Sequence, residues 1–174
     1  SLDIAPVVFQ GSTNLLGRAT VLERSFNPVG IQADYAVGLQ LKNITISNTV
    51  DSAVWFNDCY SAEAEWLSVG AGRIGFRLTA GSQLRVAHCA AVNAEDAVVV
   101  EYWNFATNTV FPVVEHNAFW EMENSVLKIT GQNKTTARNN IFSVKPGSYV
   151  YDLGTDAILT SGYNSIWLPD GGRG

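Results

Sequence analysis

The chain has 174 residues and a net charge of −5, and hydrophobic residues make up 47% of it against 16% charged residues. This composition predicts one ordered globular domain and excludes a disordered chain. The negative charge argues against a nucleic-acid partner or attraction to an anionic membrane. No apolar run approaches the roughly 20 residues that cross a bilayer, so no membrane partner is expected.

The first residues, SLDIAPVV, contain no Met and no charged region followed by an apolar one. We therefore expect no signal peptide here, and the sequence indicates either a processed protein or a segment of a longer one. The stretches VVFQG and ATVLE that follow have the alternation of strands, but less regularly than the rest of the chain.

From about residue 38, short apolar strands come in pairs: AVWFN with AEWLSV, GFRL with QLRVAHC, AVVVEY with FPVVEHN, VLKIT with TTARNN, and YVYDL with AILTSGYN. Aligning the second members places Cys89, Asn117, Asn140 and Asn164 at one position, at intervals of 28, 23 and 24 residues. A strand unit that recurs at this period predicts a solenoid, because a coil buries its apolar row only against its neighbours. Asn side chains stacked in register can then hydrogen-bond from coil to coil.

The stretches LKNITISNTVDSAVWF, IGFRL and ARNNIF resemble the repeating unit of the right-handed parallel β-helix, or pectin-lyase-like, superfamily. The resemblance covers about residues 38–168 and implies an all-β fold, a single-stranded right-handed parallel β-helix (solenoid) of about six to seven short coils. We expect one domain over residues 1–174, with irregular first coils over 1–37 and a tail over 169–174. An antiparallel sandwich is the alternative, but it is less favoured because Asn-Gly hairpin turns are absent.

Charged residues at outward strand positions are the candidate catalytic groups. Alternation places Glu115 beside Arg138 and Lys128 beside Asp152 on successive coils. The resemblance implies that such a face can carry a catalytic base and an electrophile that act on a sugar chain. The alternative, which opposite charges in register favour, is charge complementarity on a solvated sheet.

The stretch EYWNFATNTVF lengthens one coil, and long loops of solenoids often carry function. Aromatic faces suit the C–H faces of sugars, so the candidate substrate-binding residues are Glu101, Tyr102, Trp103, Phe105 and His116. The alternative is that these rings fold onto the sheet or lie in an oligomer contact.

His88 and His116 align with each other and with Asn48, Asn139 and Tyr163, which indicates a turn position more than a catalytic base. The two histidines lack an obvious third ligand and the aspartates are scattered, so we expect no metal and no cofactor.

Cys59 and Cys89 form one disulfide or remain buried free thiols. Asn43 and Asn133 begin the two N-x-T sequons, and only Asn133, in a predicted turn, is expected to be accessible to glycosylation.

The sequence thus predicts a carbohydrate-active module that binds an extended polysaccharide and, if a candidate pair is catalytic, cleaves it as a lyase or a hydrolase. The alternative is a structural, adhesive or tailspike-like segment that forms homo-oligomers through its coil ends, whose unpaired backbone edges need a cap or a partner. Whether the protein is an enzyme stays open. An extracellular or cell-surface location is expected in either case.

Overall fold

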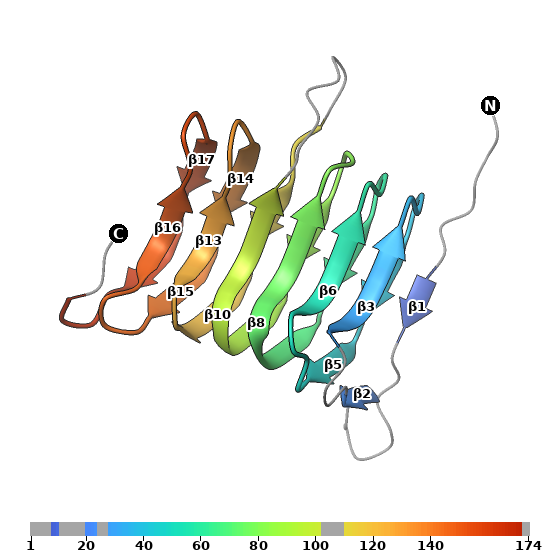
Figure 1. Cartoon of the computed structure of the whole chain (residues 1–174), viewed down its shortest axis with the longest axis horizontal. Helices are drawn as coiled ribbons and strands as arrows, with labels where there is room; N and C mark the ends of the chain where they lie inside the picture. The colour runs from blue at the N-terminus through green and yellow to red at the C-terminus, as the bar shows by residue number, and fades with distance from the viewer. Residues whose placement is uncertain (1–7, 11–19, 24–27, 102–109, 172–174) are drawn as a thin grey trace.

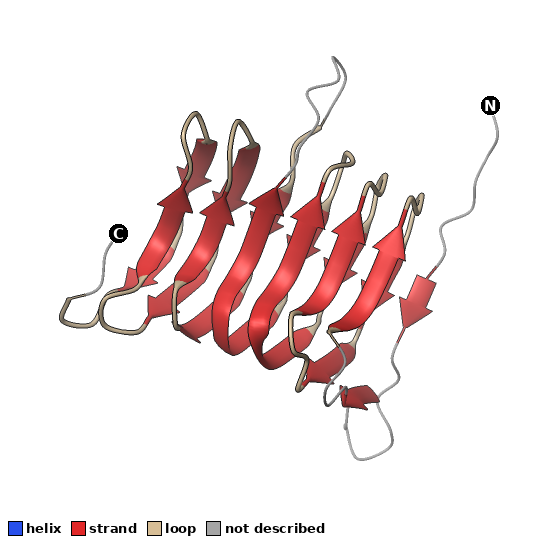
Figure 2. Ribbon diagram, in the orientation of Figure 1, coloured by secondary structure: helices blue, strands red, loops and turns tan. Residues whose placement is uncertain are grey.

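The computed structural model describes residues 8–10, 20–23, 28–101 and 110–171, and it contains no helix among them. The strands stack as a parallel β-solenoid of about six turns (Figure 1). All strand pairings of this part of the chain are parallel, which excludes the antiparallel sandwich. Figure 2 shows the strands of successive coils lying side by side, joined by short turns. The expected solenoid is therefore confirmed.

Each coil contributes strands to three faces, which we name A, B and C. Face A contains β1 (Val8–Gln10), β4 (Gln40–Lys42), β7 (Glu63–Glu65), β9 (Arg85–Ala87), β11 (Val113–Glu115), β14 (Lys134–Arg138) and β17 (Ile158–Gly162). Face B contains β2 (Thr20–Glu23), β5 (Ile44–Ser47), the first parts of β8 (Ser68–Thr79) and β10 (Ala90–Glu101), β12 (Ala118–Met122), β15 (Ile141–Val144) and β18 (Ser165–Trp167). Face C contains β3 (Val29–Asp34), β6 (Ser52–Asn57), the second parts of β8 and β10, β13 (Ser125–Ile129) and β16 (Tyr149–Leu153).

Alternation along these strands builds the core. On face A the inward side chains are small or medium in size, as at Ala64, Val86 and Ala137, and they are fully buried. Larger rings fill the space behind face B, where Phe119 stacks on Phe142 of the next coil with ring centroids 5.9 Å apart. Because each inward side chain packs on its equivalent one coil away, the apolar rows join into one continuous core.

The corner between faces A and B has a constant geometry. At each of the six corners that the structure describes, one residue with φ between 52° and 58° follows the strand of face A, namely Asn43, Trp66, His88, His116, Asn139 and Tyr163. This left-handed conformation is uncommon for residues other than Gly, and it turns the chain sharply within one residue. The expected alignment of the two histidines with Asn139 and Tyr163 is confirmed. The predicted alignment of Asn48 with these residues is wrong, because Asn48 follows β5 and lies at the next corner. Asn43 occupies the equivalent position instead.

The residue after each of these turns points into the core, and three of them form an asparagine ladder. The Oδ1 atom of Asn140 accepts hydrogen bonds from the backbone N–H of Asn117 (2.9 Å) and from its side-chain amide (3.1 Å). The amide of Asn140 in turn donates to Oδ1 of Asn164 (2.9 Å) and to the carbonyl of Val114 (3.0 Å). At the other end of the ladder, the N–H of Cys89 donates to Oδ1 of Asn117 at 2.8 Å. The predicted coil-to-coil hydrogen bonding is confirmed.

Both cysteines are free and buried. The thiol of Cys89 donates to the carbonyl of Ala87 at 3.1 Å, and burial raises the pKa of this thiol to about 12. Burial also raises the pKa of Cys59, at the corner between faces C and A. Of the two alternatives for these residues, the structure therefore has the pair of buried thiols, which burial makes poor nucleophiles.

The expected accessibility of Asn133 is wrong. This residue lies directly before β14, is only 3% exposed, and donates its side-chain amide to the carbonyl of Thr130. The turn that contains it folds inward because the polar side chain satisfies a backbone carbonyl of the same turn, a role common for Asn in tight turns.

We predict that Asn140→Ala lowers the free energy of unfolding by about 2–5 kcal/mol, because the backbone N–H of Asn117 and the carbonyl of Val114, both buried in the preceding coil, lose their hydrogen bonds to Asn140. Chemical denaturation followed by circular dichroism measures the change. The matched control is Asn139→Gly at the exposed corner, where Gly keeps the positive φ at little cost, and where we expect a change of about 0.5 kcal/mol or less. Equal stabilities of the two variants would contradict a structural role of the ladder.

Candidate functional site

The first candidate catalytic pair lies on face A. Nε of Arg138 donates to Oε2 of Glu115 at 2.7 Å, so the structure brings the two residues together as their spacing predicts. A third residue joins them, since Nε of Arg85 donates to Oε1 of the same carboxylate at 2.8 Å. Arg85 also pairs with Glu63, one coil further along. The four side chains form an alternating charge ladder across four coils.

Glu115 is the most enclosed of these groups, because its side chain is only 9% exposed. Burial by itself raises the pKa of its carboxyl, but the hydrogen bonds and positive charges of Arg85 and Arg138 outweigh that effect and lower the pKa below its ordinary value. A general base at neutral pH works best with a raised pKa and a free lone pair aimed at the substrate. Glu115 has neither, so the geometry favours the charge-complementarity interpretation of this pair.

The second candidate pair lies on face C, away from the first. Nζ of Lys128 is 3.3 Å from Oδ2 of Asp152, and both side chains are partly exposed. The register also confirms the predicted outward row, in which Trp55, Arg77, Val99, Lys128 and Asp152 follow one another. The two pairs are on different faces, so they do not form one site.

Glu101, expected to contact substrate, is instead engaged with Arg77 on face C. Nε of Arg77 lies 2.5 Å from Oε1 of Glu101, and its Nη1 atom lies 3.1 Å from Oδ2 of Asp51. The guanidinium also stacks over the ring of Trp55 at 4.7 Å from its centroid. The other three residues of the long loop, Tyr102, Trp103 and Phe105, lie outside the described residues.

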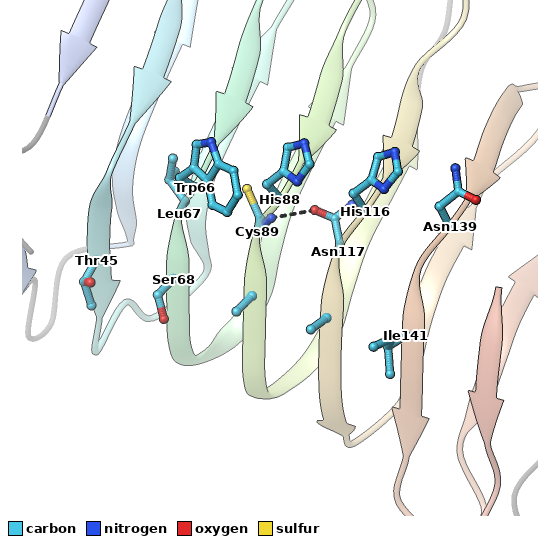
Figure 3. A pocket seen from close by; sticks show the side chains of 12 residues that line it. Thr45, Trp66, Leu67, Ser68, His88, Cys89, His116, Asn117, Asn139 and Ile141 are labelled. Atoms are coloured by element: carbon cyan, nitrogen blue, oxygen red, sulfur yellow. Dashed lines mark hydrogen bonds between the residues drawn. The ribbon is translucent and has the colours of Figure 1, made fainter. Parts of the chain in front are cut away.

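His116, the remaining candidate, lines an open groove of about 460 Å³ at the corner between faces A and B (Figure 3). Its ring stacks on that of His88 with centroids 5.1 Å apart, and His88 stacks on Trp66 at 4.5 Å. Both pairs of planes are within 10° of parallel. The three rings therefore form a column along the solenoid axis, and their edges border the groove.

The groove floor consists mainly of small side chains at the first outward position of face B. Ser68, Ala90 and Ala118 lie in register on successive strands, and Thr45 and Ile141 continue the row on either side. Five strands at about 4.8 Å make a floor about 19 Å long. Small residues leave room above the sheet, while the corner residues project beside it, which explains why a depression forms here.

Sequence reasoning missed Trp66 and this floor. Trp66 precedes Leu67 as His88 precedes Cys89, so aligning the corner of each coil could have identified it. The floor had no such signal, because Ala and Ser in a strand are ordinary residues until their register is known.

Chemically, the groove offers ring edges, hydroxyls and apolar surface. Among its lining residues there is no Asp, Glu, Lys or Arg. Within the described part of the chain, no group of three or more His, Cys, Asp and Glu side chains is arranged to hold a metal ion. The arrangement is suited to binding an elongated ligand by hydrogen bonds and apolar contacts.

Replacing Glu115 by Gln removes the charge between Arg85 and Arg138 at nearly constant size. Because the fold lowers the pKa of Glu115, the ionised carboxylate stabilises the fold above the ordinary value of 4.5, and this contribution is lost as pH falls through the lowered pKa. We predict that Glu115→Gln lowers the free energy of unfolding by about 1–2 kcal/mol at neutral pH, and that the difference from wild type shrinks below pH 4.5.

Denaturation curves across the pH range measure this difference. Glu121→Gln, at an exposed corner position, is the matched control and should change stability little at any pH. A difference between wild type and Glu115→Gln that stays constant into strong acid contradicts the assignment of the effect to the carboxylate.

No protein family, no curated protein and no solved structure matches the chain, so these comparisons do not assign it to a family. No helix long and apolar enough to cross a membrane occurs in the residues that the structure describes. The parallel β-solenoid and its groove are therefore the basis for assigning a function.

Proposed function

We propose that the protein binds an extended polysaccharide in the groove between faces A and B. The observation that carries the proposal is the column of Trp66, His88 and His116 beside a floor of small side chains that continues over five strands. Coils repeat at about 4.8 Å, a spacing comparable to the length of one pyranose ring, so successive sugars would meet similar surroundings. The rings stack on one another and present their edges to the groove, and the N–H groups and ring nitrogens of these edges suit the hydroxyls of sugars.

The geometry favours binding over cleavage. Glu115 and Arg138 neutralise each other on face A, and Lys128 and Asp152 do so on face C. An elimination or hydrolysis needs an acid or base at the bound sugar, and the groove itself contains no carboxylate among its lining residues. The resemblance to pectin-lyase-like proteins concerns the repeating unit, and it does not support lyase chemistry. Binding a structural glycan also suits an extracellular or cell-surface location.

A panel of polysaccharides tested by affinity electrophoresis and calorimetry checks the proposal. We predict that Trp66→Asn weakens binding about tenfold, because Asn keeps the corner conformation seen at Asn43 and Asn139 but removes the ring. Ala118→Gln should weaken it at least as much by filling the groove floor.

Each variant has a matched control outside the groove. Tyr60→Val removes an exposed ring between faces C and A, and Thr136→Gln lengthens an outward side chain of face A. Both controls should bind like wild type. If no polysaccharide of the panel binds, or if the groove variants and the controls lose affinity equally, the proposal is wrong.

A second candidate function, self-association through a coil end, is favoured by the side chains of the last described coil. Leu153 and Ile166 are 46% and 43% exposed, although their equivalents one coil earlier, Ile129 and Phe142, are fully buried. A second copy that stacked on this coil would bury them. We predict that sedimentation velocity then shows concentration-dependent assembly, and that Leu153→Lys abolishes it, because Leu153 continues the buried row of Ile129. Sedimentation as a monomer at all concentrations rejects this candidate.

A further inference from the structure

We infer that the polysaccharide of the groove is uncharged, and that Trp120 and Trp167 form a second stacking surface for it on face B. This inference rests on the proposed function, and it names the class of ligand that the same site accepts. It departs from what a resemblance to pectin-lyase-like proteins suggests, since it disfavours uronate polymers.

Charged side chains are unevenly distributed over the three faces of the solenoid. Face A carries the ladder of Glu63, Arg85, Glu115 and Arg138, and face C carries the ion pairs of Arg77 and Lys128. On β5, β8, β10, β12, β15 and β18 the outward positions of face B hold no charged residue: they are Thr45, Ser47, Ser68, Gly70, Ala90, Val92, Ala118, Trp120, Ile141, Ser143, Ser165 and Trp167. On the edge strand β2, Glu23 lies in register with Ser47, and it is acidic.

A carboxylate or sulfate of an anionic polymer would thus meet no cation on this face. The charged residues next to the ring column, Glu65 and Glu115, are themselves anionic and are already paired, with Lys42 at 2.8 Å and with Arg85 and Arg138. At the far corner of face B, Glu121 is acidic as well. The cations at that corner, Arg73 and Lys145, are paired with carboxylates, Arg73 with Asp51 and Glu95 and Lys145 with Glu123. Because recognition of anionic groups depends on Arg or Lys, and because the chain has a net charge of −5, face B suits a neutral ligand.

Trp120 and Trp167 form a stacked pair on face B. Trp120 lies two residues beyond Ala118 on β12, so it faces the same way as the groove floor and lies about 7 Å from it along the strand. Its ring stacks on that of Trp167 with centroids 5.7 Å apart and planes 7° from parallel. The two strands flank β15, whose outward Ser143 is fully buried. A small residue at that position lets the two indoles lie over it.

The two rings remain 43% and 55% exposed, and Val92 and Ile141 beside them are also exposed. Exposed apolar side chains gathered on one face generally mark a binding surface. Here they adjoin a groove that runs along the same axis. An uncharged glycan whose hydroxyl edges meet the ring column and whose C–H faces meet the indoles would cover both features at once.

The test uses the full chain with hexasaccharides of neutral hexoses and of uronic acids that share linkages, titrated by calorimetry at low and at high salt. We expect binding of at least one neutral oligosaccharide, with an affinity that salt leaves unchanged. Trp120→Val and Trp167→Val should each weaken it by about 2–12-fold, the range typical of one aromatic contact. Tyr60→Val should leave it unchanged, and circular dichroism should show that every variant is folded.

The possible failures are distinguishable. Binding that requires a uronic acid and weakens with salt overturns the inference and leaves polysaccharide binding in place. Neutral binding that both tryptophan variants retain overturns the second stacking surface. Concentration-dependent association that Trp120→Val abolishes, with no glycan bound, assigns the face to a protein partner and overturns both this inference and the proposed function.

Discussion

Parallel hydrogen bonding in register between coils is the constraint on which every other feature of this protein depends. A coil on its own leaves its apolar row exposed and its backbone N–H and C=O groups without partners. The row is buried and the backbone is hydrogen-bonded only when the next coil adds strands in the same direction. The asparagine ladder extends this rule to side chains. Asn140 bonds to Asn117 on one side and to Asn164 on the other, so a buried amide is stable only because its equivalents lie above and below it.

The same register sorts the surface by chemistry. On face A it brings Arg85 between Glu63 and Glu115, and this places opposite charges within hydrogen-bond distance on neighbouring coils. On face B it aligns Ser68, Ala90 and Ala118 into a shallow floor without charge. Stacking therefore makes faces of different character from strands that look alike in isolation, and it separates the residues that stabilise the fold from the surface that is open to a ligand.

The corner between faces A and B links fold and site. Its left-handed residue makes the chain turn within one position, and the side chain of that residue projects outward and stacks on its equivalent one coil away. Asn and His are favourable residues for this conformation, whereas Trp66 has a conformational cost there. A ring that is strained and 56% exposed is more readily explained by binding than by stability, and this supports placing the ligand at the corner.

The sequence by itself determined the parallel stacking, the ladder of Asn117, Asn140 and Asn164, and the neighbour pairs Glu115 with Arg138 and Lys128 with Asp152. It could do so because a strand alternates with a period of two and the coil repeats at a nearly constant length, so local spacing predicts the register. Local spacing could not show the second partner of Glu115, since Arg85 reaches it diagonally across the sheet. Nor could it show the burial of Asn133, or the groove.

Those features depend on which positions of different coils share a face and how far each side chain reaches. Only the tertiary structure decided the Arg85 contact and the groove, because they arise between strands whose residues are 20 or more positions apart. Asn133 differs, since it turns inward through a hydrogen bond within its own turn. The lack of charged side chains at the outward positions of face B from β5 to β18 is a property of the same kind. No single strand of that face is unusual, and the contrast with faces A and C emerges only after all the coils are stacked.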